Sequence, residues 1–153
     1  MQSVEKNKII LRLKIKKFLS RMTSVDKQHA DTIILQKLLQ RHEVESAKIV
    51  CCYVSFGTEV DTMQLIQQLL KMGKIVLKPE EAVNKLVDLF IVPGLGFDRK
   101  LHRLGRGGGF YDRLLANVTV PKIGLAYTCQ VIAEVPHSSY DVPITALITE
   151  EEL

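Results

Sequence analysis

The chain has 153 residues, of which 46% are hydrophobic and 25% are charged, an ordinary composition for one globular domain with its own core. The 21 basic and 17 acidic residues leave a net charge of +4, a mild excess that suits small anionic ligands and does not indicate a nucleic-acid-binding protein. No apolar run reaches the length needed to cross a bilayer, which argues against a membrane-spanning protein.

Two helices are predicted in the first 41 residues. The first runs from Lys6 to Leu19, because apolar residues recur there at helical spacing while most lysines fall outside that stripe. The stripe consists of Leu11, Ile15, Phe18 and Met22. The second helix begins at Thr23, which is followed three positions later by Asp26 in the pattern of a helix cap, and it runs to about Arg41.

A strand, a helix and a short strand come next. The apolar run 48–54 predicts a buried strand, and its two cysteines, Cys51 and Cys52, are interpreted as reduced core thiols because no CxxC spacing occurs. Glu59 is expected to open a helix that ends near Gly73, where a first-turn carboxylate would suit the helix dipole. A short strand over 74–77 is ended by Pro79.

The centre of the chain combines a strand, a glycine-rich loop and a helix. The apolar run 86–92 predicts a strand buried on both faces. A loop with six glycines follows, and a helix is expected from Phe110. This order of elements places backbone N–H groups around an anion. Arg103 and Arg106 bracket the glycines and suit bidentate phosphate contacts, and Asp112 is placed to hold a hard cation.

Taken alone, the glycine-rich loop has two interpretations, a phosphate-binding loop and a surface loop that uses glycine for turn geometry. A Walker loop is excluded because no Gly-Lys-Ser/Thr triplet occurs. The dinucleotide-binding fingerprint is excluded because Phe110 stands where a third glycine is required.

Two more strands are predicted at 122–127 and 144–148. Apolar strands that alternate with helices indicate an α/β fold, with a mostly parallel sheet between helices on both faces in a three-layer, Rossmann-like arrangement. We expect residues 1–153 to form a single domain.

The stretch from Val92 to Asp112 resembles the signature of the 5-formyltetrahydrofolate cyclo-ligases, also called 5,10-methenyltetrahydrofolate synthetases. That family has a block similar to VPGxxFDxxGxRLGxGxGYYD after a buried strand. The matching residues are Val92-Pro93-Gly94, Phe97-Asp98, Arg103-Leu104-Gly105, Gly107, Gly109 and Phe110-Tyr111-Asp112. One departure is Leu101, where the family usually has glycine, which leaves the conformation of the local turn open but not the phosphate loop itself.

The resemblance implies an enzyme that uses ATP and Mg²⁺ to convert 5-formyltetrahydrofolate to 5,10-methenyltetrahydrofolate, with release of ADP and phosphate. The implied nucleotide-binding residues are Lys8, Arg12, Arg103, Leu104, Gly105, Arg106, Gly107, Gly108, Gly109, Phe110 and Tyr111. The implied substrate-binding residues are Val54, Glu59, Arg106 and Phe110. Asp112 and Asp141 are expected to hold Mg²⁺, and Arg106 is the expected catalytic residue.

A second departure lies at 79–85, where the family normally has several tens of residues that form a hairpin and part of the folate pocket. This central hairpin is expected to be missing here. The alternative function is therefore a non-catalytic nucleotide-binding or regulatory relative that has lost folate binding. Nucleic-acid binding through the basic N-terminal helix is a third hypothesis, which predicts strongly salt-dependent binding.

For partners, we expect ATP and a reduced folate, no nucleic acid and no membrane, and we expect a monomer. The expected location is the cytoplasm. A mitochondrial location is the alternative, because residues 1–21 are basic and poor in acidic residues, in the manner of a presequence.

Overall fold

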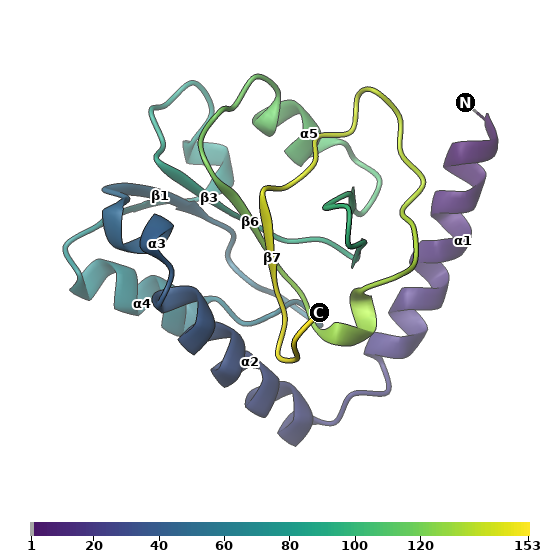
Figure 1. Ribbon diagram of the computed structural model, residues 1–153, viewed down its shortest axis with the longest axis horizontal. Coiled ribbons are helices and arrows are strands. Elements are labelled where there is room, and N and C mark those ends of the chain that lie inside the picture. The colour runs from purple at the N-terminus through teal and green to yellow at the C-terminus, as the bar shows by residue number, and fades with distance from the viewer. Residues whose placement is uncertain (1) are drawn as a thin grey trace.

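A computed structural model describes residues 2–153 of the protein. Its centre is a five-stranded sheet in the order β2-β1-β3-β6-β7, and every neighbouring pair of strands is parallel (Figure 1). The strands are β1 Ile49–Cys52, β2 Ile75–Leu77, β3 Leu89–Val92, β6 Lys122–Leu125 and β7 Ala146–Ile148. The prediction of a mostly parallel sheet from buried apolar runs is confirmed.

Helices cover both faces of the sheet because successive strand residues point to opposite sides. Val50 and Cys52 of β1 belong to one large core cluster, to which the helices of the first half of the chain contribute. These helices are α1 Gln2–Leu19, α2 Ser24–Leu39, α3 His42–Ser46 and α4 Met63–Lys71. Cys51 faces the other side and shares a second cluster with Leu115 of α5, Phe110–Leu115. The three-layer arrangement is therefore as expected.

The strand order creates a crevice at the carboxyl ends of the strands. β1 pairs with β2 on one side and with β3 on the other, so the chain leaves β1 and β3 in opposite directions. In open parallel sheets, ligands bind at the carboxyl ends of the strands where the order reverses in this way. The segments that follow β1 and β3 are thus the natural place for a binding site.

The glycine-rich loop contains a small hairpin, made of β4 Gly96–Phe97 and β5 Arg103–Leu104. The buried carboxylate of Asp98 fixes its turn by accepting hydrogen bonds from three backbone N–H groups, those of Lys100, His102 and Val135. Leu101 has φ = 70°, a left-handed conformation that glycine adopts without strain. The turn, which the sequence left open, therefore keeps a glycine-type conformation despite the leucine.

The two N-terminal helices form as predicted, with one correction. The side chain of Thr23 accepts a hydrogen bond from the N–H of Asp26 and caps α2. In α1, however, Phe18 is 45% exposed and does not belong to the buried stripe. The buried residues of this helix are Lys8, Ile15 and Leu19. The buried face of the helix is rotated relative to the predicted apolar stripe, because the Lys8 ammonium faces inward, toward the carboxylate of Asp141.

The remaining short elements are two 3₁₀ turns, η1 Pro79–Glu81 and η2 Thr128–Gln130. Within residues 2–153, no helix has the combination of length and apolar character that a membrane span requires. Cys51 and Cys52 are buried free thiols, as predicted, whereas Cys129 is exposed.

Candidate active site

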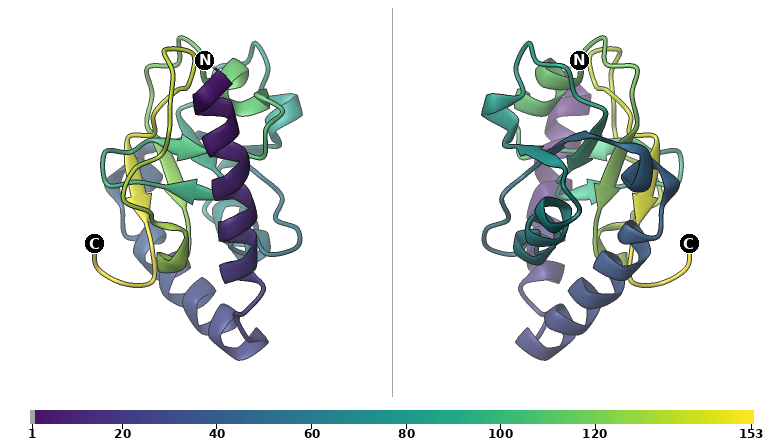
Figure 2. Two further views of the ribbon diagram at one scale, coloured as in Figure 1. Left: turned by 90° about the vertical axis from the view of Figure 1, so that its right-hand side faces the viewer. Right: turned by 90° about the vertical axis from the view of Figure 1, so that its left-hand side faces the viewer.

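A cavity of about 470 Å³ opens at the carboxyl ends of β1, β2 and β3. Its walls include Tyr53 and Val54 after β1, Lys78 and Pro79 after β2, and Gly94 after β3. The volume lies within the range of about 300–1,000 Å³ that is usual for small-molecule sites. The N-terminal half of α1 and the start of α5 lie at the same end of the molecule (Figures 1 and 2), and both supply side chains to this cavity.

The glycine-rich loop forms one wall of the cavity through residues 105–109. Gly107 and Gly109 have φ of 114° and 70°, conformations that other residues rarely adopt. A Cβ atom at Gly109 would also lie 2.9 Å from the Arg113 guanidinium. These positions explain why the loop requires glycine, and they leave its backbone open to a ligand in the cavity.

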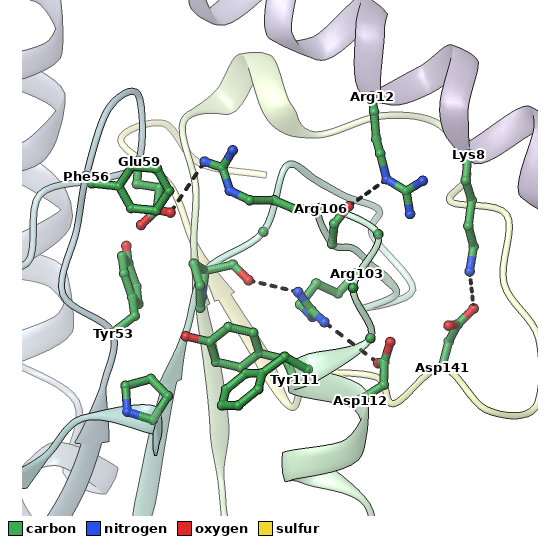
Figure 3. Close-up of a pocket in the computed structure, with 18 of the residues that line it drawn as sticks. Lys8, Arg12, Tyr53, Phe56, Glu59, Arg103, Arg106, Tyr111, Asp112 and Asp141 are labelled. Atoms are coloured by element: carbon green, nitrogen blue, oxygen red, sulfur yellow. Dashed lines mark hydrogen bonds and ion pairs between the residues drawn. The ribbon is translucent and has the colours of Figure 1, made fainter. Parts of the chain in front are cut away.

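Four basic side chains surround this loop (Figure 3), namely Lys8, Arg12, Arg103 and Arg106. Arg12 donates from Nε to the carbonyl of Gly105 over 2.8 Å, which orients the guanidinium beside the glycines. Its two terminal nitrogens have no hydrogen-bond partner within residues 2–153 and remain available to an anion.

Arg103 lies deepest of the four, with 5% of its side chain exposed. It donates to the carbonyl of Pro93 over 3.1 Å, lies 3.7 Å from a carboxylate oxygen of Asp112 and stacks over the ring of Tyr111. Burial lowers the pKa of Arg103, and the charge of Asp112 partly offsets this effect. Its Nε is buried without a hydrogen-bond partner among the described residues, so this site holds an unsatisfied donor next to the cavity.

Asp112 and Asp141 lie near each other at the edge of the cavity (Figure 3). The N–H of Val142 donates to Asp112 Oδ1, which brings the segment after Asp141 against the start of α5. Asp141 Oδ2 accepts from Lys8 Nζ over 2.7 Å and from the N–H of Ser138. Burial raises the pKa of Asp141, but the hydrogen bonds from Lys8 and the Ser138 N–H and the charge of Lys8 together outweigh this effect, and the net pKa is lowered.

The donor set of these two aspartates fits a hydrated Mg²⁺ ion. In each carboxylate, one oxygen carries the hydrogen bonds and the other has none within residues 2–153. Mg²⁺ is commonly held by one or two carboxylates together with phosphate oxygens and water. The described part of the chain contains no cluster of three or more His, Cys, Asp or Glu side chains suited to a metal, so further ligands would have to come from a phosphate and from water.

Glu59 forms an ion pair with Arg106 in the cavity wall, with 3.4 Å between Oε1 and Nη2 (Figure 3). The Arg106 guanidinium also lies 4.9 Å from the centre of the Phe56 ring. Burial raises the pKa of Glu59, and the charge of Arg106 opposes this shift. The expected first-turn position of Glu59 is wrong. The helix α4 begins only at Met63, because the Asp61 carboxylate accepts the Met63 N–H and ends the preceding loop there.

The structure brings together nearly all of the residues that the sequence analysis singled out. Lys8, Arg12, Val54, Glu59, the loop 105–111 and the two aspartates line one cavity. Leu104 is the exception, because its side chain is 1% exposed and packs in the main core, where it cannot contact a ligand.

Several wall residues were missed, among them Tyr53, Phe56, Lys78, Pro79 and Glu80. All of them lie within the four residues that follow a parallel strand, and this position was the signal that could have identified them. Pro79 and Glu80 matter most, because they come from the segment 79–85, where part of the folate pocket was expected to be missing. The 3₁₀ turn at this point closes part of the gap.

The sequence model of the 5-formyltetrahydrofolate cyclo-ligase family matches residues 4–80 and 77–150. This chain belongs to that family. The two matched parts meet at residues 77–80, the place where the sequence is expected to be shortened. The 5-formyltetrahydrofolate cyclo-ligase of Haemophilus influenzae is 30% identical over 173 aligned positions, which cover 88% of this chain and 92% of the relative. The Escherichia coli cyclo-ligase is also 30% identical, over 72% of this chain and 82% of the relative.

Solved structures of the family have the same fold. The 5,10-methenyltetrahydrofolate synthetase of Mycoplasma pneumoniae superposes with a TM-score of 0.80 at 27% identity, covering 94% of this chain and 99% of that one. The synthetase of Aquifex aeolicus gives a TM-score of 0.81 at 26% identity, covering 95% of this chain and 90% of that one. The cyclo-ligase fold is therefore retained around the shortened connection.

Proposed function

We propose that this cyclo-ligase family member converts 5-formyltetrahydrofolate and ATP to 5,10-methenyltetrahydrofolate, ADP and phosphate. The observation that carries the proposal is a single cavity with two chemically different parts. One part consists of the glycine loop and four cations, and the other contains the carboxylate of Glu59 among apolar and aromatic side chains. Both substrates can thus meet in one site.

In the proposed complex, the ATP phosphates bind the backbone of residues 105–109 together with Lys8, Arg12 and Arg103. Charged hydrogen bonds of this kind are worth about 1.5–3 kcal/mol each. Arg103 supports this placement, because it lines the cavity beside Gly105 of the loop. Mg²⁺ bound to Asp112 and Asp141 would neutralise part of the phosphate charge.

The folate is proposed to occupy the part of the cavity lined by Val54, Phe56, Glu59 and Phe110. The two aromatic rings offer apolar surface to the pterin, and Glu59 offers a carboxylate to its N–H groups. The side chain of Glu59 is 10% exposed, so hydrogen bonds to it would be shielded from water.

The proposed reaction has two steps. The formyl oxygen attacks the γ-phosphorus of ATP, and the bond to ADP breaks. The N10 nitrogen then attacks the activated formyl carbon and loses its proton, and phosphate leaves with the former formyl oxygen. Such chemistry needs positioned substrates and neutralised charge more than a protein nucleophile. Arg106 is the proposed catalytic residue, because its guanidinium lies between the glycine loop and Glu59, where the two substrates meet.

An assay for methenyl product from 5-formyltetrahydrofolate tests the proposal. We expect product formation that requires both ATP and Mg²⁺, and we expect Arg106→Ala to lose most of it. Arg99→Ala is a matched control, because Arg99 is exposed on the hairpin turn and does not line the cavity. Normal ATP binding without folate binding or product would favour the alternative, a non-catalytic nucleotide-binding relative.

The shortened connection between β2 and β3 leads us to expect different effects on the affinities for the two substrates. The residues proposed for ATP lie outside it, so ATP affinity should match that of longer relatives. Folate affinity should be weaker, because η1 replaces only part of a wall. At about 25 cal/mol per Å² of exposed apolar surface, one uncovered ring face costs on the order of 1–3 kcal/mol. Titration of each ligand against a longer relative measures both values.

We further propose that the protein acts as a single-domain monomer in the cytoplasm, on ATP and a reduced folate, without nucleic acid. Size-exclusion chromatography with light scattering tests the oligomeric state.

A further inference from the structure

A buried hydrogen-bonded group lies just behind the cavity wall that carries Glu59. The hydroxyl of Tyr127, a residue that is 1% exposed at the end of β6, lies 2.5 Å from Asp31 Oδ1 on α2. The other oxygen of Asp31 is paired with Lys27 Nζ at 2.9 Å. Burial, and then the neighbouring Asp31, raises the pKa of Tyr127, so the phenol stays neutral and donates a hydrogen bond to the carboxylate.

This group holds the loop that presents Glu59. The N–H of Asp61 donates to Asp31 Oδ1, and the Tyr127 hydroxyl lies 3.4 Å from the backbone carbonyl of Glu59. Because the single Tyr127 proton goes to the Asp31 hydrogen bond, the loop backbone is tied to α2 through the Asp61 N–H, and Tyr127 holds the Asp31 carboxylate in place for this bond. Neither Tyr127 nor Asp31 lines the cavity, so neither can contact a ligand directly.

The loop is also held from within, because Ser55 and Thr62 hydrogen-bond each other, the Thr62 hydroxyl donates to the carbonyl of Tyr53, and Val60 is buried in the main core. Tyr53 donates its hydroxyl to the carbonyl of Val60, and the Glu59 side chain reaches Arg106 over 3.4 Å. Tyr53 and Arg106 both line the cavity and would be drawn into contacts with a bound substrate. The support from Tyr127 and Asp31 is buried behind the loop and stays in place when the cavity fills.

We propose that Tyr127 and Asp31 are positioning residues that fix the Glu59 carboxylate for the folate substrate. The proposal rests on the proposed function of the cavity, and it adds residues that the substrate does not touch. A loop held in this way loses little conformational freedom when the substrate binds, which favours affinity. The nucleotide part of the cavity is attached to other elements and should not depend on this pair.

The test variant is Tyr127→Phe, which removes one hydroxyl and keeps the ring. We expect the KM and Kd for 5-formyltetrahydrofolate to rise about tenfold, the loss that corresponds to one charge-assisted hydrogen bond. The kcat and the Kd for ATP should stay within about twofold. Asp31→Asn should also weaken folate binding, and this variant replaces Tyr127→Phe as the test if Tyr127→Phe does not fold.

Thr145→Val is the matched control. Its hydroxyl accepts from the N–H of Lys122 and donates to the Lys122 carbonyl, at the opposite end of β6 from the cavity. We expect it to lower stability and leave both ligand affinities unchanged. Equal folate affinity in Tyr127→Phe and wild type would overturn the proposal, as would a parallel loss of folate and ATP binding.

Amide hydrogen exchange separates this proposal from the proposed function. Tyr127→Phe should exchange faster at residues 54–62 than Thr145→Val, with or without any ligand. If wild type binds no folate but this difference is found, the proposed function fails and the positioning of the Glu59 loop holds. If folate binds and the loop exchanges equally in both variants, the positioning claim fails alone.

Discussion

The ion pair between Lys8 and Asp141 allows a quantitative test of the site without any ligand. Lys8 Nζ and Asp141 Oδ2 are 2.7 Å apart, with side chains that are 8% and 18% exposed. In Asp141→Asn the Lys8 ammonium stays buried, and its nearest carboxylate is that of Glu5, 3.5 Å away and 64% exposed. Removing one partner of a fully buried pair costs about 3–5 kcal/mol. Residual solvent contact at Asp141 reduces our expectation to about 2–3 kcal/mol.

Urea unfolding at pH 7, without ATP or Mg²⁺, measures the effect. The double variant Lys8→Met/Asp141→Asn should recover at least half of the loss, because no buried charge is left alone. The pKa of Asp141 is lowered from 3.8 in the folded state, so its contribution is complete above that value and is lost as the pH falls through the folded pKa. A loss below about 0.5 kcal/mol, or strictly additive variants, would refute the reasoning.

Three further outcomes are expected. Arg12→Ala should weaken ATP binding about ten- to a hundredfold by calorimetry, and Lys14→Ala on the exposed side of the same helix should not change it. Burial raises the pKa of Glu59 above 4.5, so ionisation of this side chain destabilises the fold as the pH rises past that value. Glu59→Gln should therefore have a higher Tm than wild type at pH 7 and an equal Tm well below pH 4.5. The same variant should bind folate more weakly. At Leu101, where φ is 70°, Gly should be more stable than Ala by about 1 kcal/mol in chemical denaturation, the reverse of the order seen in helices.

The sheet and its layers were predictable because long-range packing and local pattern agree. Of the run predicted at 86–92, residues 89–92 form β3 and are all buried, whereas Leu86 is 88% exposed and precedes the strand. The cap at Thr23 and the glycine after α4, Gly73 with φ = 79°, were predictable because one residue type suits each position. The candidate site followed mainly from the resemblance, since spacing alone does not distinguish Lys8 and Arg12 from the other basic residues of α1.

Other features depend on contacts between distant segments and could not be read from local pattern. Phe18 fits the apolar stripe of α1, but the helix turns Lys8 inward because Asp141, far away in sequence, supplies its partner. Glu59 was wrongly placed in a helix. The start of α4 is set by a side-chain contact of Asp61 that leaves little trace in the composition of the sequence. Tyr127 ends the strand predicted at 122–127, but its role depends on a contact with Asp31, which is far away in sequence.

The connection from β2 to β3 is also a point at which the protein can be redesigned. It leaves the sheet at Leu77, forms the η1 turn and re-enters at Leu89, and only Ala82 and Val87 of the residues between pack into the second core cluster, so an insert placed between these two would leave both contacts in place. Grafting a longer loop here would add about 0.6 kcal/mol of closure entropy for each doubling of its length, a small cost to the scaffold. Pocket depth on this side is thus a property of one exchangeable insert, which makes the chain a compact host for engineering ligand selectivity.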